Sequence, residues 1–159
     1  MPRELSKYYN MSFEQKIQDD LKSAMREKNQ GALRALRAAK SAILLAKTEK
    51  GGGAEISDED GVKIIQKLVK QRNESIAIYD KQGRPELAQD EKDEVAVLEV
   101  YLPQQLSDDE LRALVQQVIE KTGASSKADM GKVMGIAMKE AAGRADGKAI
   151  SAIAAQLLS

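Results

Sequence analysis

The chain has 159 residues, of which 42% are hydrophobic and 31% charged, so it has enough apolar mass for one domain or two small ones. It contains no cysteine and no histidine, which excludes disulfides, thiolate chemistry and any Ser–His or Cys–His nucleophile within the chain. No run approaches the ~20 apolar residues of a membrane span, and the composition indicates no metal site and no cofactor. Intrinsic catalysis is therefore not expected, although carboxylates and lysines remain.

The first ten residues, MPRELSKYYN, lack the apolar stretch of a secretory signal. Because Met11 opens a segment with a stronger helical pattern, we interpret residues 1–10 as an upstream extension or a loose arm. A cytoplasmic protein is the default expectation.

Hydrophobic residues recur at helical spacing in every long segment, and no strand pattern competes with them. Capping residues, glycines and one proline predict where the helices begin and end. Seven helices are expected: one from Ser12 to Gly31, one that stops before Gly51, one from Ser57 to Gly83, one from Pro85, one from Ser107 to Gly123, one from Ser126 and one from Asp146.

Pro103 interrupts this pattern between the fourth and fifth helices. We therefore expect an all-α protein in which a four-helix N-terminal domain, residues 11–103, precedes a compact three-helix C-terminal domain, residues 107–159.

The charges are unevenly distributed, although the net charge is zero. Residues 21–50 carry a net charge of +6, residues 86–110 carry −8, and residues 124–159 carry +2. Such asymmetry permits a basic patch on a neutral protein. The more ordinary alternative is that the basic and acidic segments face each other or are simply solvated.

Two charged residues fall on apolar helical stripes. Arg72 continues the apolar face of the third expected helix, and Glu91 lies between Leu87 and Val95 on the fourth. Consecutive helices joined by a short turn usually pack antiparallel, and an unpaired buried charge is costly. The sequence therefore predicts a structural ion pair between Arg72 and Glu91; a catalytic or binding pair is the alternative.

The sixth expected helix contains glycines, which cost about 1 kcal/mol each relative to alanine. Gly131 and Gly135 flank an apolar face, and Lys132 and Lys139 lie just beyond them. The residues expected on that face are Met130, Met134, Ala137 and Ala141, with Val133 and Met138 at its edges. A flank of small residues allows close approach either by another helix or by a ligand.

The connection into the last helix is also basic and rich in glycine. Arg144, Gly147 and Lys148 surround a helix N-terminus, where free N–H groups and the helix dipole favour an anion. A phosphate site and an ordinary capped turn with solvated charges are both compatible with this pattern.

These segments resemble a known family. DMGKVMG at 129–135 and GRADG at 143–147 resemble the tail domain of GatB, the B subunit of the glutamine-dependent Asp/Glu-tRNA amidotransferases. Further motifs resemble the free-standing YqeY family: LRALRAAKSAI at 33–43, KQRNESI at 70–76, GRPELA at 83–88 and YLPQQLS at 101–107. Together they cover nearly the whole chain from Met11.

The resemblance implies an all-helical protein with a C-terminal domain shared with GatB, whose tail is implicated in gripping the tRNA elbow. The family is also linked to carbon–nitrogen ligase activity with glutamine as amido-N-donor. This chain has neither the ATP cradle of GatB nor the serine–lysine machinery of the amidase subunit, so amidotransferase activity does not follow from the resemblance.

We therefore expect a tRNA-binding accessory module that recognises phosphate and shape, since aromatic stacking platforms are scarce. The expected RNA-binding residues are Gly131, Lys132, Gly135, Lys139, Arg144, Gly147 and Lys148. The sequence leaves open whether Arg34, Arg37 and Lys40 extend this footprint. The alternative is a protein–protein adaptor that docks on an aminoacyl-tRNA synthetase or an amidotransferase.

Overall fold

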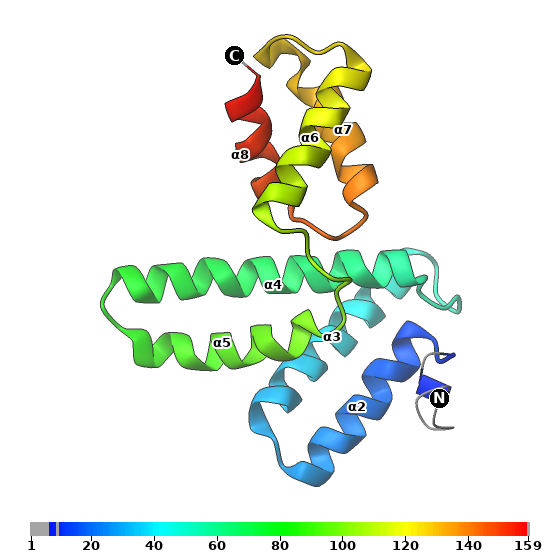
Figure 1. Ribbon diagram of the computed structural model, residues 1–159. Coiled ribbons are helices and arrows are strands. Elements are labelled where there is room, and N and C mark those ends of the chain that lie inside the picture. Colours follow the sequence, from blue (N-terminus) through cyan, green and yellow to red (C-terminus); the bar gives the residue numbers. More distant parts are fainter. Residues whose placement is uncertain (1–6, 9, 159) are drawn as a thin grey trace. The chain divides into compact units, whose positions relative to one another are not determined.

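The structure, a computed structural model, describes residues 7, 8 and 10–158 (Figure 1). Within them all regular structure is helical, which confirms the expected all-α class. The helices are α2 Phe13–Glu27, α3 Gln30–Glu49, α4 Asp58–Lys81, α5 Pro85–Glu99, α6 Asp108–Thr122, the short 3₁₀-helix η1 Lys127–Asp129, α7 Met130–Ala141 and α8 Gly147–Leu157. Most of the proposed N-terminal arm lies outside the described residues.

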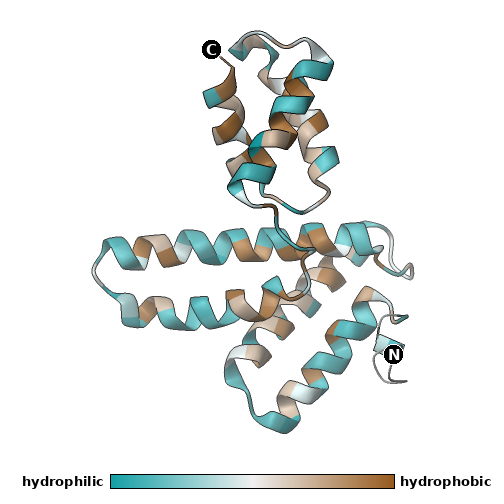
Figure 2. Ribbon diagram, viewed as in Figure 1, coloured by the Kyte–Doolittle hydropathy of each residue, from teal (hydrophilic) through white to brown (hydrophobic). Residues whose placement is uncertain are grey.

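The chain divides into two compact units, residues 1–101 and residues 102–159. Polar and apolar residues alternate along the helices of both units, as expected for helices that each bury one side (Figure 2). The expected domain bounds, residues 11–103 and 107–159, stay a prediction.

In the first unit, α2 and α3 form one helical hairpin and α4 and α5 form another, and α3 packs against α5 and α4. Among the side chains fully buried in this unit are Ile17, Leu36, Ile65 and Leu98. The hydroxyl of Tyr101 donates a hydrogen bond to Asp20, which ties the chain just after α5 to α2. Burial, reinforced by this carboxylate, raises the pKa of Tyr101 above its ordinary value.

The boundary between α2 and α3 differs from the expectation that Gly31 ends the first helix. Helix α2 ends at Glu27, Lys28 adopts the left-handed conformation, and the Asn29 side chain caps α3 by accepting a hydrogen bond from the backbone of Ala32 at 3.1 Å. Gly31 lies inside α3, where an added Cβ would be 3.4 Å from Cβ of Asp93 in α5. Gly31 therefore faces α5 and does not terminate a helix, and an added Cβ would make an ordinary van der Waals contact there.

The predicted ion pair between Arg72 and Glu91 is wrong in its partner. Nη2 of Arg72 lies 3.5 Å from Oε1 of Glu94, a buried residue, whereas Glu91 is only half-buried. Arg72 lies eleven residues before Gly83 and Glu94 eleven residues after it, so an antiparallel hairpin turning at Gly83 places them opposite each other. Helix α5 also packs against α3, and this widens its buried side beyond the stripe expected from α4 alone.

In the second unit, α6, α7 and α8 pack around one apolar core. Its fully buried side chains include Val115, Val118, Val133, Ile150 and Leu158. The backbone N–H of Leu106 donates to the carbonyl of Arg144 at 2.8 Å, and the Gln105 side chain donates to the carbonyl of Gly143 at 3.1 Å. These bonds hold the segment before α6 against the α7–α8 connection.

Helix α7 ends at a strained position. Ala142 has a φ of 49°, in the left-handed region, where a Cβ costs roughly 1–2 kcal/mol. We expect Ala142→Gly to raise the free energy of unfolding by up to about 1 kcal/mol, because the relieved strain exceeds the added entropy of the unfolded chain. Urea denaturation measures the effect. Ala152→Gly, at an exposed site within α8, should instead lower stability by about 1 kcal/mol; equal losses in both variants would contradict the strain.

Candidate nucleic-acid interface

Helix α7 buries a side that is rotated from the one expected. Val133, Ala137 and Ala141 are buried, Met130 and Met134 are half-buried, and Met138 is 46% exposed. The expected face comprised Met130, Met134, Ala137 and Ala141 with Val133 at one edge, but α7 packs against both α6 and α8, and these two neighbours enclose Val133.

This rotation places the α7 glycines on the solvent side. A Cβ added to Gly131 or Gly135 would meet no described atom within 4 Å beyond the immediate helix backbone. Lys132 and Lys139 are exposed, and neither forms an ion pair with a described residue. Of the two explanations for the glycines, packing against another helix of the same unit is therefore wrong, and approach from outside that unit stays a prediction.

The start of this helix is organised by Asp129. Its carboxylate accepts hydrogen bonds from the backbone N–H groups of Ser125, at 3.0 Å, and Ser126, at 3.4 Å. These bonds hold the pKa of Asp129 below its ordinary value, and the charge of Lys132 lowers it further. The N-terminal region of α7 thus already holds a carboxylate.

The N-terminus of α8 is capped by the side chain of Asp146, whereas Asp129 accepts from residues before α7 and does not cap that helix. Asp146 accepts a hydrogen bond from the backbone N–H of Ala149 at 2.7 Å, so its carboxylate occupies the position expected for a phosphate. Nη2 of Arg144 lies 4.0 Å from Oε2 of Glu110, and Lys148 is exposed with no ion pair to a described residue. The capped-turn interpretation therefore describes this connection. Lys148 lies beside it without an ion pair to a described residue, and Arg144 is partly neutralised by Glu110.

Met138 lies between the two regions of the candidate interface, the glycines of α7 and the N-terminus of α8. A Cβ on Gly147 would lie 3.4 Å from Sδ of Met138, which is itself exposed. The surface formed by Gly131, Gly135, Met138 and Gly147 we call the α7 face. Sequence spacing assigned Met138 to the edge of the core because it follows Met134 by one helical turn, so periodicity alone gave no indication of its exposure.

Two further kinds of functional feature can be assessed in the described part of the chain, a metal-binding group and a membrane-spanning helix. No group of three or more Asp and Glu side chains there could hold a metal ion. None of the described helices is long and apolar enough to cross a membrane.

Comparison with known proteins shows the family of this chain. Residues 14–158 match the family model described as Yqey-like protein. The chain is also similar to "Altered inheritance of mitochondria protein 41, mitochondrial" of Pyrenophora tritici-repentis (strain Pt-1C-BFP), with 33% identity over 132 residues, or 82% of this chain and 71% of the relative. The relative's name places that protein in mitochondria, so a cytoplasmic location for this chain stays a prediction.

Proposed function

Because this chain belongs to the YqeY-like protein family, we propose that it is a tRNA-binding accessory module of aminoacyl-tRNA or amidotransferase metabolism. The observation that carries the proposal is the open space above Gly131 and Gly135. Two glycines within one helix cost stability, and no packing contact in the described chain explains why they are retained. A partner that approaches the backbone closely explains them.

The neighbouring charges favour a phosphate backbone as that partner. Lys132 and Lys139 border the α7 face, and Arg144 and Lys148 lie on the connection that follows it. Exposed cations around a smooth surface suit ribose-phosphate contacts, which position structured RNA through shape. The chain has no Trp and one Phe, so stacking of bases on aromatic side chains contributes little.

A protein–protein adaptor is the second candidate, and the exposure of Met138 favours it. Exposed methionine is frequent on surfaces that accommodate protein partners. Such an adaptor would dock on an aminoacyl-tRNA synthetase or an amidotransferase through the α7 face. Phosphate binding weakens steeply with salt, whereas apolar docking does not, so a salt titration separates the two candidates.

We propose no intrinsic catalysis, although the family is linked to carbon–nitrogen ligase activity with glutamine as amido-N-donor. The α7 face combines glycines, lysines and a methionine, and these residues do not provide a nucleophile with an adjacent base and an oxyanion site. A catalytic amidotransferase would have to supply these groups to the module.

The proposal predicts that Gly135→Leu weakens binding to unfractionated tRNA without lowering stability. Leucine favours the helix by almost 1 kcal/mol over glycine and has open space here, but it obstructs the α7 face. Lys132→Ala and Lys139→Ala should each reduce the salt dependence of binding by about one unit of slope. Fluorescence anisotropy across a salt series measures both effects.

Lys121→Ala is the matched control, because this exposed lysine lies on α6 and already pairs with Glu140 at 3.4 Å. We expect it to leave tRNA affinity unchanged. Unaltered tRNA affinity in all three α7 variants would rule out this face as the RNA site. Early melting of Gly135→Leu would show that the glycines serve packing after all.

A further inference from the structure

The α2–α3 hairpin retains cations that no carboxylate neutralises. Of the eight Lys and Arg residues between 21 and 50, three form ion pairs: Arg34 with Asp90 at 3.4 Å, Lys47 with Glu14 at 3.1 Å, and Lys50 with Asp60. The others are exposed and form no ion pair with a described residue: Lys22, Arg26, Lys28, Arg37 and Lys40. Ion pairs therefore neutralise the basic segment, residues 21–50, only in part. Its unpaired cations lie on α2, on α3 and at the turn between them.

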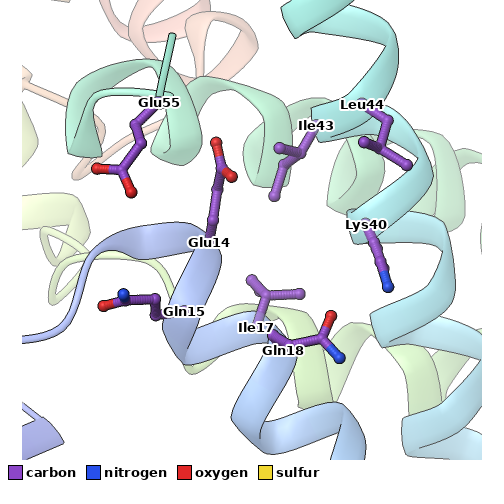
Figure 3. Close-up of a pocket in the computed structure, with 8 residues that line it drawn as sticks. All are labelled: Glu14, Gln15, Ile17, Gln18, Lys40, Ile43, Leu44 and Glu55. Atoms are coloured by element: carbon purple, nitrogen blue, oxygen red, sulfur yellow. The ribbon is translucent and has the colours of Figure 1, made fainter. Parts of the chain in front are cut away.

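Three of these cations lie on the same side of the hairpin. Gln18 of α2 and Lys40 of α3 both line a pocket of about 250 Å³ between the two helices (Figure 3). Lys22 follows Gln18 by four residues and Arg37 precedes Lys40 by three, spacings that keep side chains on one face of a helix. Lys22, Arg37 and Lys40 therefore form one surface, which we call the hairpin patch.

The pocket itself is a poor anion site, because Glu14 and Glu55 form part of its lining. One oxygen of Glu14 accepts from Lys47, and the other accepts from the backbone N–H of Ile56 at 3.0 Å. Glu14 therefore fastens the α3–α4 loop to α2. The charge available to a ligand is that of the hairpin patch, on the part of the groove nearer to the α2–α3 turn.

Unpaired, exposed cations close together attract a polyanion and exchange their counterions for its phosphates. Leu44, which is 55% exposed beside the patch, also permits an acidic protein as partner. Single exposed leucines are common on protein surfaces, however, whereas five unpaired cations with one intervening acid, Glu27, are a concentrated charge. RNA is therefore the favoured partner.

We infer that the hairpin patch is a second phosphate-binding surface and that one structured RNA contacts both units of the chain. This inference rests on the proposed function of the α7 face. Once either unit has bound, the short connection between them keeps the other at a high effective concentration near the same RNA. Arg34 is excluded from the patch because Asp90 partly neutralises it.

The test uses the full chain with Lys22, Arg37 and Lys40 all changed to Gln, and unfractionated tRNA as the probe. We expect affinity at 0.1 M salt to fall roughly tenfold or more, and the salt slope to decrease by about two to three units. The matched control changes Lys67, Lys70 and Lys81 to Gln. These are exposed lysines of α4 without ion pairs to described residues, so the net charge changes equally. Circular dichroism verifies that both triple variants are folded.

The possible outcomes separate the two proposals. A loss confined to the hairpin variant supports the second surface, and equal losses in both triple variants would attribute the effect to net charge and overturn it. If the α7 variants weaken binding and the hairpin variant does not, the second surface is wrong and the proposed function stands. If the hairpin variant and the α7 variants all bind tRNA with the affinity of the unmodified chain, both proposals are wrong.

Discussion

Replacing Arg72 by alanine is expected to lower the free energy of unfolding by about 3 kcal/mol, because it leaves the carboxylate of Glu94 buried without its partner. The two side chains are only 15% and 11% exposed, and their closest atoms are 3.5 Å apart. Arg72 also donates a hydrogen bond from Nη1 to the carbonyl of Leu68 at 3.2 Å. Urea denaturation with a constant m-value measures the change.

Two sets of control variants test whether the loss comes from burial of the ion pair between Arg72 and Glu94. Lys92→Ala removes a cation from the same helical hairpin, but its pair with Asp80 is 3.8 Å long and almost half exposed on both sides, so it should cost less than 1 kcal/mol. Glu94→Ala should cost more than Glu91→Ala, since only Glu94 pairs with the arginine. Similar small losses in all four variants would show that water reaches the pair.

The buried pair is not expected to be the best solution for stability alone. Nε of Arg72 is buried without a hydrogen-bond partner among the described residues, and an unsatisfied buried donor is costly. Replacing Arg72 by Met and Glu94 by Leu together should therefore recover most of the stability lost in either alanine variant. The two residues lie at matching positions of the helical hairpin, each eleven residues from Gly83.

Local features of the fold could be predicted from the sequence because they depend on residues close together in the chain. Ser12, Ser57, Ser107 and Asp146 each cap the helix that they were expected to begin. Capping requires only a side-chain oxygen and a backbone N–H two or three residues later. The all-α class follows in the same way from periodicity.

Features that depend on a third helix could not be obtained from the pattern of one helix or one hairpin. Gly31 was assigned to a helix end, but it lies inside α3 and faces Asp93 of α5. Met138 was placed near the core, yet the joint packing of α6 and α8 on α7 turns it outward. The burial of Glu94 likewise requires α3 beside α5. The errors at Met138 and at the partner of Arg72 come from treating the buried face as the apolar stripe.

Only part of the candidate site could be predicted from the sequence. Residue type drew attention to the α7 glycines and lysines, but only the structure distinguishes a glycine enclosed by internal packing from one facing open space. Gly61 of α4 and Gly135 of α7 illustrate this difference. Both lie inside helices, and one is enclosed whereas the other is open.

Gly61→Ala is expected to destabilise the protein by about 1–3 kcal/mol, although alanine is the better helix former by about 1 kcal/mol. An added Cβ would lie 2.7 Å from Cγ and Cδ1 of Phe13, and that ring cannot easily retreat because it is 5% exposed and packs edge-on against Tyr101 with centroids 6.0 Å apart. Overpacking therefore outweighs helix propensity.

Gly135→Ala is the matched control and should stabilise by up to about 1 kcal/mol, since its Cβ enters open space. Phe13→Leu in the Gly61→Ala background should recover part of the loss relative to the sum of the single changes. Thermal unfolding of the four variants measures these differences, and a Gly61→Ala protein as stable as the unmodified chain would show that the ring moves freely.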